Sequence, residues 1–275
     1  MTGPDQAVAV PALPLRPFVS HYAGSRMRDV PPGRHAGLPS RHLDLIVSLA
    51  KPIEILRMPG AQSPGAYRAF VAGLQQAPAL VRMGGELDCL HVFLKPGAAR
   101  ALLGVSGREV ATQVVHLADI SGALYRELIE RVADADTWLE RFAAVDRVLL
   151  RWLRPVAMPA VMASAWRSLT LSHGRLTVHS LARDSGFSQR HFGERFTSEF
   201  GIPPKAAARV FRFERACRLF LRSPRRIVDV ALASGFHDQA HMVREWHALA
   251  GCTPREWIRS ELPFLQDYEI GGSHD

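Results

Sequence analysis

Residues 181–187 read Leu181-Ala182-Arg183-Asp184-Ser185-Gly186-Phe187, and a similar stretch, Val230-Ala231-Leu232-Ala233-Ser234-Gly235-Phe236, follows 49 positions later. Past this point the shift is 50, because one residue is inserted at the second turn. The next matching pairs are Phe192 and Met242, Phe196 and Trp246, Gly201 and Gly251, and Pro204 and Pro254. Self-similarity of this kind indicates one supersecondary unit that is present twice.

Each copy is predicted to be a short helix, a tight turn and a second helix. Gly186 and Gly235 come where a helix ends, and glycine adopts the left-handed conformation there without a steric penalty. Ser188 and Asp238 stand just ahead of the next helix, where their side chains can accept hydrogen bonds from unpaired N–H groups. This arrangement is a helix-turn-helix motif.

The second helix of each copy has an apolar face and a polar face. Phe192 and Phe196 are four residues apart, as are Met242 and Trp246, so each pair covers one side of its helix. An α-helix fits the DNA major groove, where each base pair shows a distinct set of donors and acceptors. The residues left to face outward are Gln189, Arg190, Gly193 and Glu194 in the first copy and Gln239, His241, Val243 and Arg244 in the second.

A single helix is predicted over residues 204–221, between the two copies. At 1.5 Å per residue its length is about 27 Å, enough to hold two recognition helices about one duplex turn, near 34 Å, apart. Basic residues concentrate in the same region: residues 166–262 hold 16 Lys and Arg against 9 Asp and Glu. Such an excess is typical of a surface that neutralises phosphates, although a solvated helix face is the alternative.

The whole chain has 275 residues, of which 47% are apolar and 22% are charged, with a net charge of +8. That length predicts one to two domains with a sizeable core and excludes a disordered polymer. The three cysteines are far apart and form no CxxC pair, which argues against a disulfide scaffold. The chain shows neither a basic start followed by an apolar stretch nor an apolar run of about 18 residues, so we expect a cytoplasmic protein.

The N-terminal half is predicted to be rich in β-structure. Pro155 and Pro159 mark a break, since proline donates no hydrogen bond and disfavours helix in the residue before it. Branched residues between turn signals predict strands over 42–49, 53–58, 69–74 and 87–94. Apolar residues three and four apart predict helices over 98–103, 124–133 and 138–153.

The doubled unit resembles the DNA-binding domain of the AraC family of transcription regulators. The resemblance covers roughly residues 160–260 and rests on many positions. They include Ser180-Leu181-Ala182, Phe187-Ser188, Phe196, Phe200-Gly201, Val230-Ala231, Gly235-Phe236-His237-Asp238-Gln239-Ala240-His241 and Gly251-Cys252-Thr253-Pro254-Arg255-Glu256-Trp257. It implies seven helices with the fourth as connector, and recognition helices over about 188–199 and 238–249. Gly193 and Glu194 replace longer or basic side chains often found in the family, and Met242 and Trp246 replace a Phe pair.

The N-terminal half is similar, less closely, to the sensor half of some of these regulators, at residues 42–47 and 93–104. The resemblance implies an α+β fold: a β-rich, barrel-like effector and dimerisation domain with a helical hairpin (1–155), an all-α double helix-turn-helix domain (160–262) and a tail (263–275). It implies double-stranded DNA as partner. A small-molecule effector, RNA polymerase and a second copy of the chain are further candidate partners.

The favoured hypothesis is therefore a non-enzymatic transcription regulator that contacts two successive major-groove segments, without cofactor or metal; activation and repression both stay open. Gln189, Arg190, Gln239 and Arg244 are predicted to contact bases, and Arg195, Arg209 and Arg212 to hold phosphates. The resemblance carries base or phosphate contact over to Gly193, Glu194, Ala240 and Val243 as well, and His241 completes the candidate set.

Other interpretations remain for particular residues. A cupin-like enzyme tethered to nucleic acid is the alternative function, with a metal held by His35, His42, Asp44 and His91, although the HxH-plus-Glu spacing is missing. His237 and His241 are four apart, as zinc ligands often are, but lack a third ligand at fixed spacing. Trp138, Phe142, Trp152 and Trp166 line an effector pocket or belong to the core.

Overall fold

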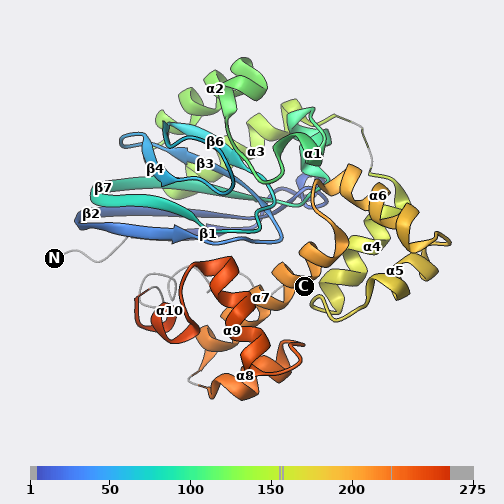
Figure 1. Ribbon diagram of the computed structural model, residues 1–275. Helices are drawn as coiled ribbons and strands as arrows, with labels where there is room; N and C mark the ends of the chain where they lie inside the picture. The colour runs from blue at the N-terminus through green and yellow to red at the C-terminus, as the bar shows by residue number, and fades with distance from the viewer. Residues whose placement is uncertain (1–4, 155, 157, 224, 261–275) are drawn as a thin grey trace.

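The computed structural model describes residues 5–154, 156, 158–223 and 225–260, and it consists of a sheet domain followed by a helical domain (Figure 1). This confirms the predicted α+β fold. Pro155, within the predicted break, and the predicted tail from 263 to 275 lie outside the described residues. Across the described ranges, no helix is both long enough and apolar enough to cross a membrane.

The N-terminal sheet is antiparallel, and its hydrogen-bonded strands follow the order β1-β2-β7-β3-β6-β8, with β4 pairing to β7 and β5. The strands are β1 (Asp5–Ala9), β2 (Val19–Gly37), β3 (Leu43–Ser48), β4 (Ile53–Arg57), β5 (Gly65–Tyr67), β6 (Ala69–Ala72), β7 (Ala79–Leu94) and β8 (Val114–His116). The two long strands, β2 and β7, pair with each other along most of their length, and β7 also pairs with β3 and β4.

The sequence patterns predicted β3, β4, β6 and the second half of β7 but missed the longest strand, β2. Its alternation is broken by register shifts between Val19 and His21, Met27 and Val30, and Val30 and Gly33. Among the described residues, β1 pairs with the first part of β2, up to Arg26, and no described strand pairs with the later part on that side. Prolines at 31 and 32 are tolerated there, because an edge position needs no N–H donor.

Helices α2 (Leu117–Ala133) and α3 (Trp138–Trp152) cover one face of this sheet (Figure 1). Their buried residues join Leu45, Val47, Leu90 and Val92 in one hydrophobic cluster. Three short helical segments complete the domain: η1 (Leu13–Leu15), the π-helix η2 (Ala99–Leu103) and α1 (Gly107–Val110). The helix predicted from 124 lies in the second part of α2, which follows a kink at Ser121 (φ −156°, ψ 102°), and Ser121 Oγ accepts a hydrogen bond from Leu124 N–H (3.3 Å).

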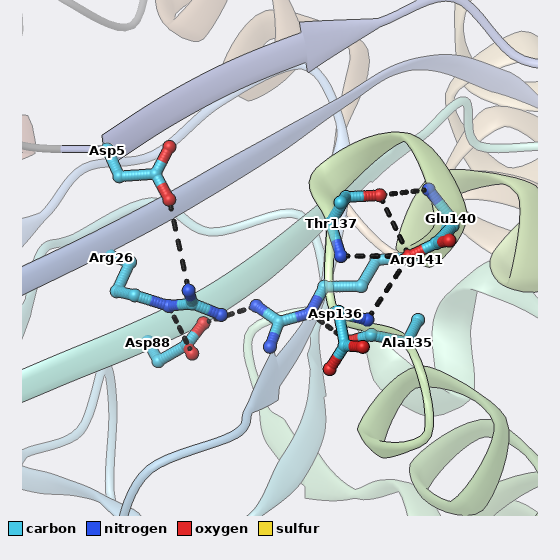
Figure 2. A network of polar contacts seen from close by, with 8 residues as sticks. All are labelled: Asp5, Arg26, Asp88, Ala135, Asp136, Thr137, Glu140 and Arg141. Carbon is cyan, nitrogen blue, oxygen red and sulfur yellow. Dashed lines mark hydrogen bonds and ion pairs between the residues drawn. The ribbon is translucent and has the colours of Figure 1, made fainter.

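A network of charged side chains ties the start of α3 to the sheet (Figure 2). The Asp88 carboxylate on β7 accepts hydrogen bonds from Arg26 Nε (3.0 Å) and Arg141 Nη1 (2.9 Å). The Arg141 guanidinium also stacks on Trp138, 4.8 Å from its ring centroid. Because Arg141 and Asp88 are both buried, removal of the Asp88 carboxylate would leave the buried charge of Arg141 uncompensated.

The C-terminal domain contains seven α-helices within the described residues, and the fourth of them is the connector, as the family resemblance implied. They are α4 (Ala160–Leu171), α5 (Val178–Asp184), α6 (Gln189–Phe200), α7 (Pro204–Arg222), α8 (Ile227–Ala233), α9 (Gln239–Ala250) and α10 (Pro254–Ser260). α7 has 19 residues, about 28 Å at 1.5 Å per residue, and contributes to the core of both helix-turn-helix units.

Candidate nucleic-acid interface

The two helices predicted to contact DNA bases, α6 and α9, are called the recognition helices below, and they begin and end in the same way. Ser188 Oγ accepts a hydrogen bond from His191 N–H (3.3 Å), and Asp238 Oδ1 accepts one from His241 N–H (2.6 Å). Both helices end on a left-handed glycine, Gly201 or Gly251. Each helix has 12 residues, displaced by one from the predicted boundaries. The local structure of the repeat is therefore as predicted.

The inner face of each helix is fully buried. Phe192 and Phe196 pack with Phe200 and Trp166 in the first unit. In the second unit, Trp246 fills the position of Phe196, and its larger ring makes T-shaped contacts with three aromatic side chains. These are Phe213, Phe220 and Trp257.

The outer face of α6 carries an ion pair. Arg190 Nε lies 3.0 Å from Glu194 Oε1, one helical turn away, and the two side chains are 90% and 62% exposed. Gln189 Nε2 lies 2.7 Å from Nδ1 of His179, which is on α5. The structure thus brings these three predicted residues to the surface together. Exposed surface pairs of this kind contribute little to stability and can exchange partners with a ligand.

Arg195 lies one turn further along α6 and is also exposed. Its Nε donates to His191 Nε2 (2.9 Å), and its guanidinium is 5.1 Å from the Phe187 ring. Gly193, between these groups, is partly buried by its neighbours but leaves open space where a side chain would project.

The outer face of α9 is different in character. Gln239, Ala240 and Arg244 are exposed, and Val243 is partly exposed. His241 is turned toward Glu245, with Nε2 at 3.8 Å from Oε1. The negatively charged position of the first face, Glu194, is occupied by Arg244 in the second.

Arg209 and Arg212, predicted to hold phosphates, are both engaged inside the domain. Arg209 Nε forms an ion pair with the Glu245 carboxylate on α9. Arg212 Nη1 donates to the Gly174 carbonyl (2.8 Å), and its guanidinium lies 5.7 Å from the Phe236 ring. Burial lowers the pKa of Arg212. Both arginines therefore connect α7 to the helix-turn-helix units.

The end of α6 is held against the sheet domain. Glu199 is 9% exposed, and its two carboxylate oxygens accept hydrogen bonds from Arg100 Nε (3.1 Å) and Nη2 (3.2 Å) of η2. A Cβ added to Gly201 would lie 2.2 Å from Ala111 Cβ, and one added to Gly107 would lie 2.4 Å from the Glu199 carbonyl oxygen. Only glycine at these positions allows α1 and α6 to approach so closely (Figure 1).

A second contact joins α7 to the sheet domain. The backbone N–H of Arg41 donates to Glu214 Oε1 (2.8 Å), and Arg41 Nε lies 3.7 Å from Oε2. Asp44 on β3 is close by, and burial, followed by the charge of Glu214, raises its pKa to about 7. Leu38, beyond the end of β2, packs against the hydrophobic cluster of the second unit.

The sequence patterns did not predict Glu199, Glu245, Glu214 or Arg100 as functional residues. Glu199 and Glu245 lie on recognition helices, yet each pairs with an arginine far away in the sequence. The available signal was a charged residue at a buried helical position: Glu199 matches Leu249 in the second copy. Such a residue needs a partner, but its identity requires the fold.

The structure also bears on the two alternative sites, the metal site and the aromatic pocket. Within the ranges that the structure describes, no group of three or more His, Cys, Asp and Glu could hold a metal ion. His21, His42 and His91 instead cluster around Phe93, and burial lowers the pKa of each. Trp138 and Phe142 belong to the sheet-domain core and Trp152 packs against it, whereas Trp166 packs in the helical domain, so the four side chains do not line one common pocket and the core alternative is supported.

Two protein-family models match the chain. Residues 181–260 match a family described as a helix-turn-helix domain, and residues 8–116 match a domain of unknown function (DUF6597). The HTH-type transcriptional regulator ExsA of Pseudomonas aeruginosa is 34% identical over 77 residues, 28% of each chain. The virulence regulon transcriptional activator VirF of Yersinia enterocolitica is 33% identical over 79 residues, 29% of each chain. The match thus spans less than a third of either relative.

Solved structures extend the likeness to the whole fold. ToxT from Vibrio cholerae aligns over 94% of this chain and 98% of its own, with a TM-score of 0.52 and 9% sequence identity. At that identity the comparison establishes the fold alone. From the repeat, the seven helices and these matches, we conclude that residues 181–260 form a helix-turn-helix domain similar to those of the named regulators, in a chain that shares the two-domain fold of ToxT.

Proposed function

We propose that this protein is a sequence-specific DNA-binding transcription regulator, with α6 and α9 entering two successive segments of the major groove. The observation that carries the proposal is the pair of capped, 12-residue helices with exposed outer faces on either side of a 19-residue connector. The connector length matches roughly one turn of B-form DNA. The helix-turn-helix family match over residues 181–260 and the names of the relatives, which are transcriptional regulators, support the same function.

Base contact is proposed for Gln189, Arg190, Gln239 and Arg244, which are all exposed. Phosphate contact is proposed for Arg195, which is exposed, and for Arg209 and Arg212. The last two would first have to release Glu245 and the Gly174 carbonyl, so we expect Arg195 to contribute most.

The sheet domain is proposed to control DNA binding in response to a small molecule or a partner. Its direct contacts with both units, through Glu199 and Glu214, would transmit such a signal. ToxT has been solved bound to (E)-4-(8-methylnaphthalen-1-yl)but-3-enoic acid, which supports a small-molecule effector for this fold.

A second copy of the chain and RNA polymerase are proposed as partners on the family resemblance. Residues 1–155 and 160–262 are proposed as the two domains, acting in the cytoplasm where the DNA lies.

The competing hypothesis, an enzyme tethered to nucleic acid, has no support from the matched relatives, which are named as regulators. A metal assay on the purified protein addresses it directly. Stoichiometric bound metal would favour the enzyme over the regulator.

Selection from a pool of random duplexes by the purified full-length chain tests the proposed function. We expect one enriched sequence, with Arg190→Ala and Arg244→Ala each weakening binding by about 1–3 kcal/mol and relaxing preference at one base pair. Arg195→Ala should weaken binding to all sequences alike. It should also reduce, by about one unit, the slope of the logarithm of the binding constant against the logarithm of the salt concentration.

Arg147→Ala is the matched control, because this arginine is exposed on α3 in the sheet domain. It should leave selection unchanged. Failure to enrich any duplex sequence, or unaltered binding by both Arg190→Ala and Arg244→Ala, would refute the proposal.

A further inference from the structure

The outer faces of α6 and α9 differ at three of four equivalent positions. Both helices have 12 residues, the same type of N-cap and the same glycine stop, so residues 50 apart occupy equivalent places. The four equivalent pairs are Gln189 and Gln239, Arg190 and Ala240, Gly193 and Val243, and Glu194 and Arg244.

The face of α6 is polar and self-paired. Arg190 Nε and Glu194 Oε1 are 3.0 Å apart. An arginine can donate two hydrogen bonds to guanine, and a glutamate can accept one from the cytosine amino group. Nothing lies within 4 Å of a Cβ built on Gly193, so this face presents no aliphatic surface between the two charges.

The face of α9 has aliphatic groups at the same places. Ala240 is exposed and Val243 partly exposed, one turn apart. The core of this unit takes Met242, Trp246 and Leu249 from α9, and both aliphatic residues lie outside that described cluster. Their methyl groups are therefore turned away from the core. Among the base pairs, only A·T places a methyl group in the major groove, at C5 of thymine.

We infer that the two helices recognise different classes of base pair: α9 selects thymine through methyl contacts with Ala240 and Val243, and α6 selects G·C pairs through Arg190 and Glu194. The inference rests on the proposed DNA-binding function and adds the base class that each helix recognises. The DNA site would then be chemically asymmetric, with one half dependent on thymine methyl groups and the other independent of them.

The experiment uses the full-length chain and the duplex that it enriches from a random pool. The base position relaxed by Arg244→Ala assigns one half of the site to α9, and the position relaxed by Arg190→Ala assigns the other half to α6. Each thymine is then replaced by uracil, which keeps the base pairing but lacks the methyl group. We expect binding to weaken about fourfold for each contacted methyl in the α9 half and to stay unchanged in the α6 half.

Two variants sharpen the assignment. Val243→Ala should shrink the thymine-to-uracil difference in the α9 half, since two methyl groups are removed from a partly exposed side chain. The reciprocal variant, Gly193→Val, fits open space on α6 and should create a thymine preference, about fourfold, at the position it faces. Thermal unfolding of both variants confirms that they are folded at the temperature of the binding assay.

The possible failures are distinguishable. If no duplex is enriched, the proposed function itself is refuted, and the inference falls with it. If a duplex is enriched but uracil has no effect in the α9 half, or has an equal effect in both halves, the inference is overturned while the regulator function stands.

Discussion

The helix-turn-helix unit formed by α5 and α6 and the one formed by α8 and α9 have helices of the same lengths, 7 and 12 residues, yet they meet the sheet domain in different ways. Near its end, α6 carries Glu199, which pairs with Arg100. The equivalent residue of α9, Leu249, packs inside its own unit. The sheet domain reaches the second unit chiefly through Glu214 on α7. The glutamate at this position thus gives α6 an ion pair with the sheet domain that α9 lacks at the equivalent residue.

The largest expected loss of stability comes from substituting the buried aromatic residues that occupy equivalent positions in the two units. Phe196→Ala and Trp246→Ala should each lower the free energy of unfolding by about 3–5 kcal/mol, because both side chains are fully buried. Urea denaturation measures the loss, and hydrogen exchange shows which unit loosens. Leu171→Ala, at an exposed apolar residue of α4, is the control. Exchange that rises equally in both units for either variant would show that they are not separate cores.

The glycines that end α6 and α9 distinguish the two contacts with the sheet domain. Gly201→Ala and Gly251→Ala both place a side chain in the left-handed region, at a cost of about 1–2 kcal/mol. Gly201→Ala also brings its Cβ to 2.2 Å from Ala111 Cβ, whereas the nearest atom to the new Cβ at Gly251 is Pro78 Cγ at 3.4 Å. We expect Gly201→Ala to cost about 1–3 kcal/mol more. Equal unfolding free energies for the two variants would contradict the close approach of α1 and α6.

The contact of α7 with the sheet domain should respond to pH through Asp44. Its pKa of about 7 in the folded protein exceeds the ordinary value because burial and Glu214 favour the protonated form. This contribution to stability is fully present below about pH 4 and is lost as the pH rises through 7. The melting temperature of the unmodified protein should therefore fall relative to that of Asp44→Asn between pH 5 and pH 8, because asparagine does not titrate. Asp229→Asn, at an exposed position on α8, should show no such trend, and a constant difference for Asp44→Asn would contradict the assignment.

The smallest expected effects concern the N-caps of the recognition helices. Ser188→Ala should destabilise the protein by about 1 kcal/mol at any pH, because its hydroxyl does not titrate. The Asp238 carboxylate has a lowered pKa, chiefly because it accepts the His241 N–H. Its contribution is present above the ordinary aspartate pKa and disappears as the pH falls through the lowered value. Thermal unfolding of Ser188→Ala and Asp238→Ala at pH 7 and pH 3 distinguishes the two caps. If both variants lose the same stability at both pH values, the charge of Asp238 does not contribute.

The helical domain could be predicted nearly completely because its signals are local. Turn glycines, capping residues and apolar spacing occur within single helices, and the observed α6, α7 and α9 begin within one residue of their predicted starts. In the sheet domain, β2 was missed because Asp29, at φ 55°, and three register shifts interrupt its alternation. Its extended form is stabilised by pairing with β7, which lies more than forty residues away.

Of the candidate DNA-contacting residues, some could be placed from the sequence and others only from the structure. Helical spacing alone indicates that Gln189, Arg190, Gln239 and Arg244 face outward. Nothing in the spacing indicates that Arg209 and Arg212 are held by Glu245 and the Gly174 carbonyl, because those partners lie 36 and 38 residues away. The sequence by itself determined two helix-turn-helix units, their boundaries and their outward faces, since hydrogen bonds and side-chain spacing within one helix specify them. Only the tertiary structure decided which helix the sheet domain holds, because a buried charge acquires its partner when distant segments pack together.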